Sequence, residues 1–290
     1  PLDEFRSPTN YLRRHAASIP AGLYLSQRER FKQTFELSLT LPNDVPTLAK
    51  NSAGRSSSMG SIYLIRHGQA SFGAENYDVL SPLGYRQSEA LGDYLAQLDV
   101  SFDRCLSGEL ERQQNTARAT LARLGAQPEL EVDAAFNEFH ADAVIRAHLP
   151  DLLQVEPNAM HILRNAADHR ADFQRLFTHV VHRWISGEHE KDDLESWQHF
   201  LDRVRGGLER VLDQAGKRDR IAIFTSGGTI TALLQLIIGV PPIKAFEMNW
   251  QIVNTSLSLL KFRDRDVALA SFNSHAHLQL LKNPELVTHR

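Results

Sequence analysis

The sequence predicts an α/β fold with three layers, in which helices cover a mostly parallel central sheet. Two short apolar runs, Ile62–Ile65 and Ile221–Phe224, are each followed by a loop that contains glycine, which is typical of buried parallel strands. From Ser61 onward, such strands alternate with segments that have the apolar spacing of helices. This alternation favours parallel strands that are joined by helices.

A helix, a strand and a second helix are predicted between residues 81 and 124. Ser81 and Pro82 have the residue types of an N-cap and a first helical position. The run Phe102–Leu106 predicts the strand, in which Cys105 is a small buried hydrophobe, and Leu110–Leu124 predicts the second helix. The first helix has apolar side chains at three- and four-residue spacing: Leu91, Tyr94, Leu95 and Leu98.

The second half of the chain continues this pattern with one interruption. Residues 136–190 are rich in histidine and lack strand signals, so we expect a helical cap inserted over the core. Apolar residues from Leu194 to Val211 keep helical spacing. The runs Leu257–Phe262 and Val267–Phe272 predict two final strands with a turn between them.

Residues 1–58 differ from the rest of the chain. They contain five prolines and end in a small polar run, residues 51–58, which is typical of a flexible linker. We expect this segment to be an N-terminal extension to an α/β domain of residues 59–290. A native tail or a targeting segment is the alternative, although acidic residues count against a transit peptide.

Composition and charge limit the classes of protein to which the chain can belong. The chain has 290 residues, of which 42% are apolar and 23% charged, as in soluble globular domains. A net charge of −3 argues against a generally basic nucleic-acid-binding surface, and no apolar run reaches the roughly 18 residues of a membrane span. The single cysteine, Cys105, excludes a disulfide framework and fits a reducing compartment. We therefore expect a cytoplasmic protein with neither nucleic-acid nor membrane partners.

Two predicted strand ends carry residue types that suit phosphate chemistry, and ligands of open α/β sheets bind at such ends. The segment Arg66–Gln69 places a cation beside a nucleophilic imidazole. The segment Thr225–Gly228 offers backbone N–H groups at the start of a helix, which is a natural anion site. Arg112, on the first turns of its predicted helix, faces the same edge, so we expect a phosphate site there.

These motifs resemble those of the histidine phosphatase superfamily, in the branch that includes the cofactor-dependent phosphoglycerate mutases. The resemblance covers residues 61–280 and implies a phosphoglycerate mutase-like fold. Its motifs occur in the family's order and near its spacing: Arg66 to Gly68, Leu80 to Gly84 with Gln87, Ser107 with Arg112, Thr116 and Ala117, Trp250 with Asn254 to Ser256, and Asn273 with His277 and Leu278.

The resemblance implies a role for each matching residue. His67 matches the histidine that takes the phosphoryl group as a phosphohistidine. Arg66 and Arg112 match the two arginines that hold the phosphoryl oxygens. Glu138 matches the usual position of the proton donor to the leaving group, although Glu131 and Asp142 lie nearby in the sequence.

One position departs from the family. Its second catalytic histidine usually lies in a Ser-His-Gly-Gly motif after the late strand, and Ser226 occupies that position here. Serine offers one neutral hydroxyl donor, so we expect Ser226 and Gly227 to bind phosphate while turnover is slowed. Alternatively, the Ser226 side chain only caps the helix that follows.

A metal site is the competing interpretation of the histidine-rich segment. His179 and His182 lie three residues apart on a predicted helix, a spacing that metal ligands can have. No His-Glu-x-x-His pattern is present, so we expect a solvated helical face instead. The predicted phosphate site requires neither a metal nor a cofactor.

Two functions fit these observations. The first is a metal-independent phosphomonoesterase that acts on a small phosphorylated substrate through a phosphohistidine on His67. The second is a catalytically impaired phospho-ligand-binding protein of the same fold. A serine hydrolase that uses Ser226 is disfavoured, because Phe224 stands where a nucleophile elbow needs glycine. A mutase is also less favoured, and the substrate and the oligomeric state stay open.

Overall fold

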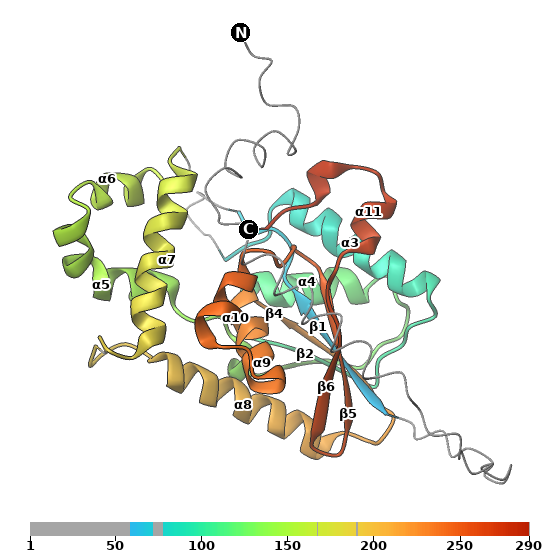
Figure 1. Cartoon of the computed structure of the whole chain (residues 1–290). Coiled ribbons are helices and arrows are strands. Elements are labelled where there is room, and N and C mark those ends of the chain that lie inside the picture. The colour runs from blue at the N-terminus through green and yellow to red at the C-terminus, as the bar shows by residue number, and fades with distance from the viewer. Residues whose placement is uncertain (1–58, 72–77, 167, 190, 290) are drawn as a thin grey trace, which may run out of the picture. The chain divides into compact units, whose positions relative to one another are not determined.

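The computed structural model describes residues 59–71, 78–166, 168–189 and 191–289 (Figure 1). The chain divides into two units, Pro1–Ser56 and Ser57–Arg290, and every described residue belongs to the second. The predicted N-terminal extension of residues 1–58 therefore lies outside the described residues.

One six-stranded sheet forms the centre of the described unit, with the strand order β3-β2-β4-β1-β5-β6. The first four strands in the chain are mutually parallel, whereas β5 pairs antiparallel with both β1 and β6. The predicted α/β fold with a mostly parallel sheet is thus confirmed. The strands are β1 (Gly60–Arg66), β2 (Arg104–Ser107), β3 (Leu130–Val132), β4 (Arg220–Thr225), β5 (Leu257–Arg263) and β6 (Asp266–Ser274).

Alternating side chains of the central strands face two helical layers, which gives the three layers predicted from the sequence. Ile62 and Leu64 of β1 pack into the cluster that contains Val204 and Ile230, from α8 and α9. Ile65, on the opposite face, packs with residues of α3 and α4. The helices of these layers are α3 (Pro82–Gln97), α4 (Glu111–Leu121), α8 (Trp197–Gln214) and α9 (Gly227–Ile238).

Further helices lie beyond these two layers. In the stretch that the sequence analysis assigned to a helical cap, α5, α6 and α7 lie to the left of the sheet in Figure 1. The sequence analysis predicted neither the helix α10 nor the short strand β3. The strand β3 has only three residues, two of which are exposed, so it has no apolar run that would indicate a strand. These helices are α5 (Ala141–Val155), α6 (Ala159–Arg164), α7 (Arg170–Ser186), α10 (Pro242–Asn249) and α11 (Ala276–Leu280), with the 3₁₀ turns η2 (Ala134–Phe136) and η3 (Pro284–Leu286).

Local features of the described residues follow the sequence chemistry. The Ser81 hydroxyl accepts a hydrogen bond from the Gly84 N–H at 3.0 Å, so Ser81 caps α3 as predicted. Cys105 is buried in β2, and burial raises the pKa of its thiol to about 12.

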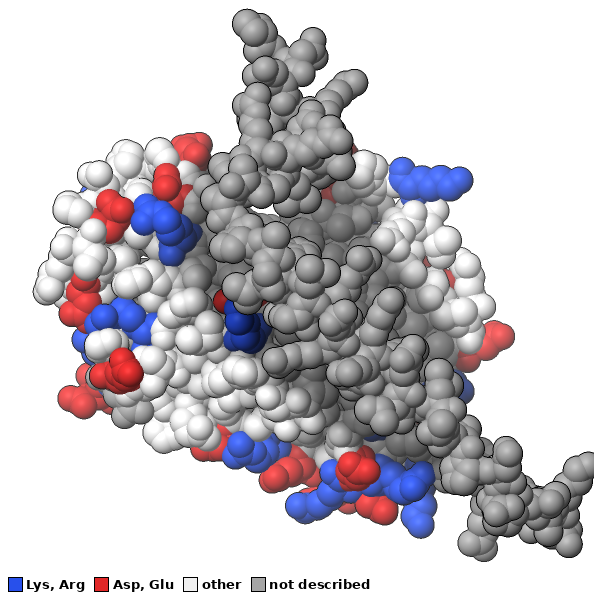
Figure 2. All heavy atoms as spheres, viewed as in Figure 1, with Lys and Arg blue, Asp and Glu red and all other residues white. Residues whose placement is uncertain are grey.

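Basic and acidic side chains are intermixed along the lower edge of the face shown in Figure 2. No helix among the described residues is long and apolar enough to cross a membrane.

Candidate active site

His67 lies buried directly after β1, in the loop that begins at the carboxyl end of this strand. Its Nδ1 atom is 2.7 Å from the Gly68 carbonyl oxygen. A carbonyl can only accept a hydrogen bond, so Nδ1 carries the ring proton and Nε2 carries the lone pair. Nε2 faces the Nε–H group of Arg112 at 3.3 Å.

The surroundings of His67 favour its neutral form. Burial, followed by the charges of Arg112 and Arg66, holds the pKa of His67 well below its usual range. The imidazole is therefore neutral at neutral pH. A neutral imidazole with its lone pair on Nε2 is the form that can act as a nucleophile.

The motif residues that carried the family resemblance hold the backbone around His67. The Thr116 hydroxyl accepts from the Gly68 N–H at 2.9 Å, and the Asn254 amide donates to the His67 carbonyl at 3.0 Å. Gln87 accepts from the Gln69 N–H at 2.8 Å. Because these contacts come from two helices and from the loop before β5, the orientation of the His67 loop is fixed from several sides.

The two predicted phosphate-binding arginines are both oriented by oxygen acceptors. Arg66 donates from its guanidinium to the Ile252 carbonyl. Arg112 lies in the first turn of α4 and forms an ion pair with Asp78 at 2.7 Å. Asp78 also accepts from the backbone N–H of Glu111 at 2.8 Å, so it ties the start of α4 to Arg112. Sequence reasoning did not identify Asp78, which belongs to none of the recognised motifs.

Glu138 follows the η2 turn and lies half-buried beside the start of α9. One carboxylate oxygen accepts from the Gly228 N–H at 3.0 Å, and the other accepts from its neighbour Phe139 at 3.1 Å. Burial raises the pKa of Glu138 above its usual range, against the opposing effects of the Gly228 N–H and of Arg112. A carboxyl group with a raised pKa is suited to proton transfer.

The alternatives to Glu138 are oriented differently. Glu131 forms an ion pair with Arg104 at 2.6 Å, and the Arg104 hydrogen bond lowers its pKa. Asp142 is exposed in the first turn of α5. The charges of Arg112 and Arg66 both act to lower the pKa of Glu138, so this carboxylate lies within reach of the two arginines.

Ser226 does not cap α9 with its side chain, although it occupies the N-cap position. Its buried hydroxyl instead accepts a hydrogen bond from the Gln113 amide at 2.8 Å. The same amide nitrogen donates to the Phe136 carbonyl at 3.0 Å. The capping interpretation is therefore wrong, because Gln113 reaches the hydroxyl from α4 and occupies the space beside it.

Gly227 is the first residue of α9 and lies close to Arg66, one of the two arginines predicted to bind phosphate. A Cβ atom at Gly227 would lie 3.8 Å from the Arg66 Nε atom and 2.3 Å from the Asn249 side-chain oxygen. The structure thus brings all six predicted site residues into one region at the carboxyl ends of β1 and β4: His67, Glu138, Arg66, Arg112, Ser226 and Gly227.

The sequence matches the family described as histidine phosphatase superfamily (branch 1) over residues 62–172 and 164–275. The chain belongs to this superfamily. A curated relative, the 2,3-bisphosphoglycerate-dependent phosphoglycerate mutase of Rhizobium etli, is 33% identical over 87 residues, which are 27% of this chain and 41% of that protein. The matched segment thus spans less than half the length of that relative.

Solved structures of a phosphoglycerate mutase and of two phosphatases resemble this chain at low sequence identity. The phosphoglycerate mutase of Bacillus anthracis gives a TM-score of 0.54 at 17% identity, covering 78% of this chain and 98% of that one. The phosphoserine phosphatase of Entamoeba histolytica, solved with 3-phosphoglyceric acid, gives 0.52 at 18% identity, covering 76% and 100%. A mycobacterial glucosyl-3-phosphoglycerate phosphatase, solved with VO3, gives 0.52 at 19%, covering 74% and 99%. These likenesses support the superfamily's fold for this chain.

The described residues of this superfamily member contain no group of three or more histidine, cysteine, aspartate or glutamate side chains that could hold a metal ion. His179 is exposed on α7, and His182 is half-buried one turn further along. The contacts around His67 are made by arginine, amide, hydroxyl and backbone groups.

We expect Gly228→Ala to disturb the proposed acid. A Cβ atom at this position would lie 2.1 Å from a Glu138 carboxylate oxygen, closer than two such atoms can approach, so the carboxylate must move. The free energy of unfolding should fall by about 1–3 kcal/mol. Phosphatase kcat/KM should fall at least about tenfold, because Glu138 leaves its position.

The matched control is Gly206→Ala in α8, where a Cβ atom would be 3.5 Å from Arg210 and in ordinary contact. Alanine in a helix interior should raise the free energy of unfolding by about 0.5–1 kcal/mol and leave activity unchanged. Thermal unfolding and steady-state kinetics of both variants check the pair. Full activity of Gly228→Ala would show that the Glu138 position is not needed.

Proposed function

We propose that this chain is a metal-independent phosphomonoesterase that works through a phosphohistidine on His67. The observation that carries the proposal is the state of the His67 ring. The Nδ1–H group donates a hydrogen bond to the Gly68 carbonyl, while Nε2 is unprotonated and faces Arg112. A nucleophilic nitrogen beside a fixed cation supports attack on an anionic phosphoryl group.

In the first proposed step, the lone pair of His67 Nε2 forms a bond to phosphorus while the bond to the leaving oxygen breaks. Glu138 donates its proton to that oxygen. In the second step, water attacks the phosphohistidine, Glu138 takes a proton from the water, and inorganic phosphate leaves as neutral His67 is restored. Arg66, Arg112 and the start of α9 stabilise the charge on the phosphoryl oxygens.

We propose a small phosphorylated compound as the substrate. One structurally similar protein, the phosphoserine phosphatase of Entamoeba histolytica, was solved with 3-phosphoglyceric acid and, as a mutant, with phosphoserine. The site is built around one phosphoryl group and supports no choice between these compounds. The proposed protein is cytoplasmic and binds neither nucleic acid nor membranes.

A second candidate function is supported by one observation. The Ser226 hydroxyl is bonded to Gln113, at the position where the resemblance implies the family's second catalytic histidine. A protein with this arrangement would keep Arg66 and Arg112 for binding but would lack one donor to the transition state. The second candidate is therefore a phospho-ligand-binding protein with weak turnover.

A panel of phosphomonoesters, assayed with and without EDTA, tests the proposed function. We expect at least one member to be hydrolysed, with equal rates in the presence and absence of the chelator. Strong inhibition by EDTA would contradict the metal-independent mechanism. Binding of inorganic phosphate or vanadate without hydrolysis of any ester would favour the binding protein.

The pH dependence of kcat/KM should show two limbs. Activity requires neutral His67, so kcat/KM falls as the pH drops through its lowered pKa. Activity also requires protonated Glu138, so kcat/KM falls again as the pH rises through its raised pKa. In Glu138→Gln, which cannot ionise, the alkaline limb should disappear while the acid limb stays. An unchanged alkaline limb in this variant would exclude Glu138 as the acid.

A further inference from the structure

The segment that bears Glu138 has little regular structure of its own, and side chains bind its backbone carbonyls. We call residues 134–139 the acid loop. The Phe136 carbonyl accepts from Gln113 at 3.0 Å and from the Thr225 hydroxyl at 2.7 Å. The Asn137 carbonyl accepts from the Thr229 hydroxyl at 3.0 Å. Backbone groups in irregular segments need such partners, so these contacts fix the path of the loop.

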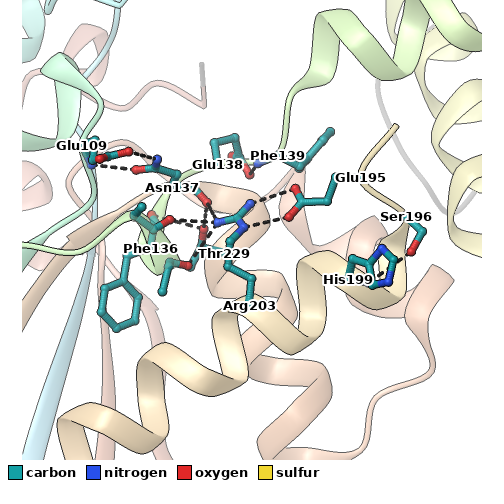
Figure 3. Close-up of polar contacts among 12 residues, drawn as sticks. Glu109, Phe136, Asn137, Glu138, Phe139, Glu195, Ser196, His199, Arg203 and Thr229 are labelled. Carbon is teal, nitrogen blue, oxygen red and sulfur yellow. Dashed lines mark hydrogen bonds and ion pairs between the residues drawn. The ribbon is translucent and has the colours of Figure 1, made fainter. Parts of the chain in front are cut away.

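Arg203 binds the acid loop from the side of α8 (Figure 3). One terminal nitrogen of its guanidinium lies 3.1–3.2 Å from the carbonyl oxygens of Ala134, Ala135 and Asn137. The Asn137 carbonyl belongs to the peptide group that leads directly into Glu138. A single side chain therefore holds three carbonyls of the loop that presents the proposed acid.

Glu195 orients Arg203 for this task. Its carboxylate accepts from the Nε–H of Arg203 at 2.8 Å and from the second terminal nitrogen at 2.9 Å. This fork leaves the remaining nitrogen directed at the loop, as Figure 3 shows. The guanidinium also lies 5.0 Å from the centre of the Phe200 ring. Arg203 and Glu195 are both partly buried, with 26% of each side chain exposed, so the pair is held in place.

The same pair is connected to the helix α7. The Trp184 indole N–H donates to the Glu195 backbone carbonyl at 2.8 Å. The Trp184 ring also packs on the Phe139 ring, with centroids 4.8 Å apart, and Phe139 is the residue after Glu138. Arg203 thus fixes the backbone directly before Glu138, and the contact between Trp184 and Phe139 fixes the residue directly after it.

We infer that Arg203, oriented by Glu195, is a positioning residue for the acid and base Glu138. This inference rests on the proposed role of Glu138 in proton transfer. Arg203 touches no reacting atom, and it acts by fixing the peptide groups from which the Glu138 side chain extends. Lysine is not equivalent here, because a single ammonium group cannot bind the carboxylate as a fork and the carbonyls at once.

The dependence of kcat/KM on the leaving group separates a positioning role from a general structural one. The 4-nitrophenolate ion is a weak base and departs with little protonation, whereas the phenolate ion is a stronger base and needs a proton from the acid. We expect Arg203→Met to lower kcat/KM about tenfold or more for phenyl phosphate and less than about threefold for 4-nitrophenyl phosphate. Arg203→Lys and Glu195→Gln should also lower kcat/KM more for phenyl phosphate than for 4-nitrophenyl phosphate, but by smaller factors.

Arg205→Met is the matched control. Arg205 lies on the same helix, and its variant loses an exposed ion pair with Asp202. Among the described residues, Arg205 makes no hydrogen bond or ion pair with the acid loop. The kcat/KM of this variant for both esters should stay within about twofold of the parent chain. Circular dichroism and thermal unfolding of each variant show whether it is folded, and Glu195→Gln serves if Arg203→Met does not fold.

Glu138→Gln provides the reference for the acid itself. One outcome is that Glu138→Gln lowers kcat/KM for phenyl phosphate selectively while the Arg203 and Glu195 variants lower kcat/KM for both esters equally. In that case the inference is overturned and the proposed function stands. If Glu138→Gln shows no selectivity either, or the parent chain hydrolyses neither ester, the proposed acid and the inference both fail. Selective loss in all these variants, but not in Arg205→Met, supports the positioning role.

Discussion

We expect His67→Ala to lower phosphatase turnover by about 10⁴-fold or more, because the variant removes the atom that takes the phosphoryl group. The reason is specific to Nε2, whose lone pair is kept available by the contact between Nδ1 and the Gly68 carbonyl. Alanine leaves Arg66 and Arg112 in place, so vanadate or phosphate binding should persist. Kinetics with the best ester of the panel and a binding titration measure the two effects.

A covalent label gives an independent readout of the same prediction. With a phosphorylated substrate carrying ³²P, the parent chain should acquire label that is stable to base and labile to acid, as phosphohistidine is. The label should be absent from His67→Ala. His179→Ala, on an exposed face of α7, is the control and should be labelled normally. Label that persists in His67→Ala would place the nucleophile elsewhere.

The His67 loop could be predicted from sequence because local pattern and strand order determine it together. An apolar run that ends in Arg66 and His67 predicts a buried strand with its functional residues at the carboxyl end. The distant motif residues Thr116 and Asn254 bind the backbone of this loop, which explains why they accompany it in sequence. Their spacing therefore carried real information about the site.

The contacts that modify this site could not be predicted in the same way. Gln113 looks like an ordinary polar residue of a helix, and only the folded chain brings its amide from α4 to Ser226, at the start of α9. Arg203 likewise fits the polar positions of an amphipathic helix, and the acid-loop carbonyls to which it donates lie 66 to 69 residues earlier in the chain. Long-range hydrogen bonds of this kind leave no periodic signal, because each depends on one pair of positions.

The pairing of Gln113 with Ser226 determines whether a histidine can be placed at position 226, where the resemblance implies the family's second catalytic histidine. Ser226 is fully buried, and its hydroxyl lies 2.8 Å from the Gln113 amide nitrogen. An imidazole at this position would overlap that amide, and overpacking a buried site typically costs about 1–3 kcal/mol. We therefore expect Ser226→His alone to lower the melting temperature without increasing turnover.

The double variant Gln113→Ala with Ser226→His should behave differently. Alanine removes the amide and opens the space that an imidazole needs, while the Phe136 carbonyl keeps its hydrogen bond from Thr225. The imidazole then adds one donor toward the phosphoryl oxygens. Donors of this kind contribute about 10²–10³ in rate, and we expect an increase of about 10- to 10³-fold in kcat over the parent chain.

The single variant Gln113→Ala is the control, and it should lose activity modestly because the Ser226 hydroxyl loses its donor. The gain must therefore appear only when both changes are combined, as a coupling between neighbouring side chains. Equal gains in Ser226→His and in the double variant would show that Gln113 does not block the position. A double variant that folds and binds vanadate but hydrolyses no ester faster would favour the phospho-ligand-binding function, because the missing donor would then not be what limits turnover.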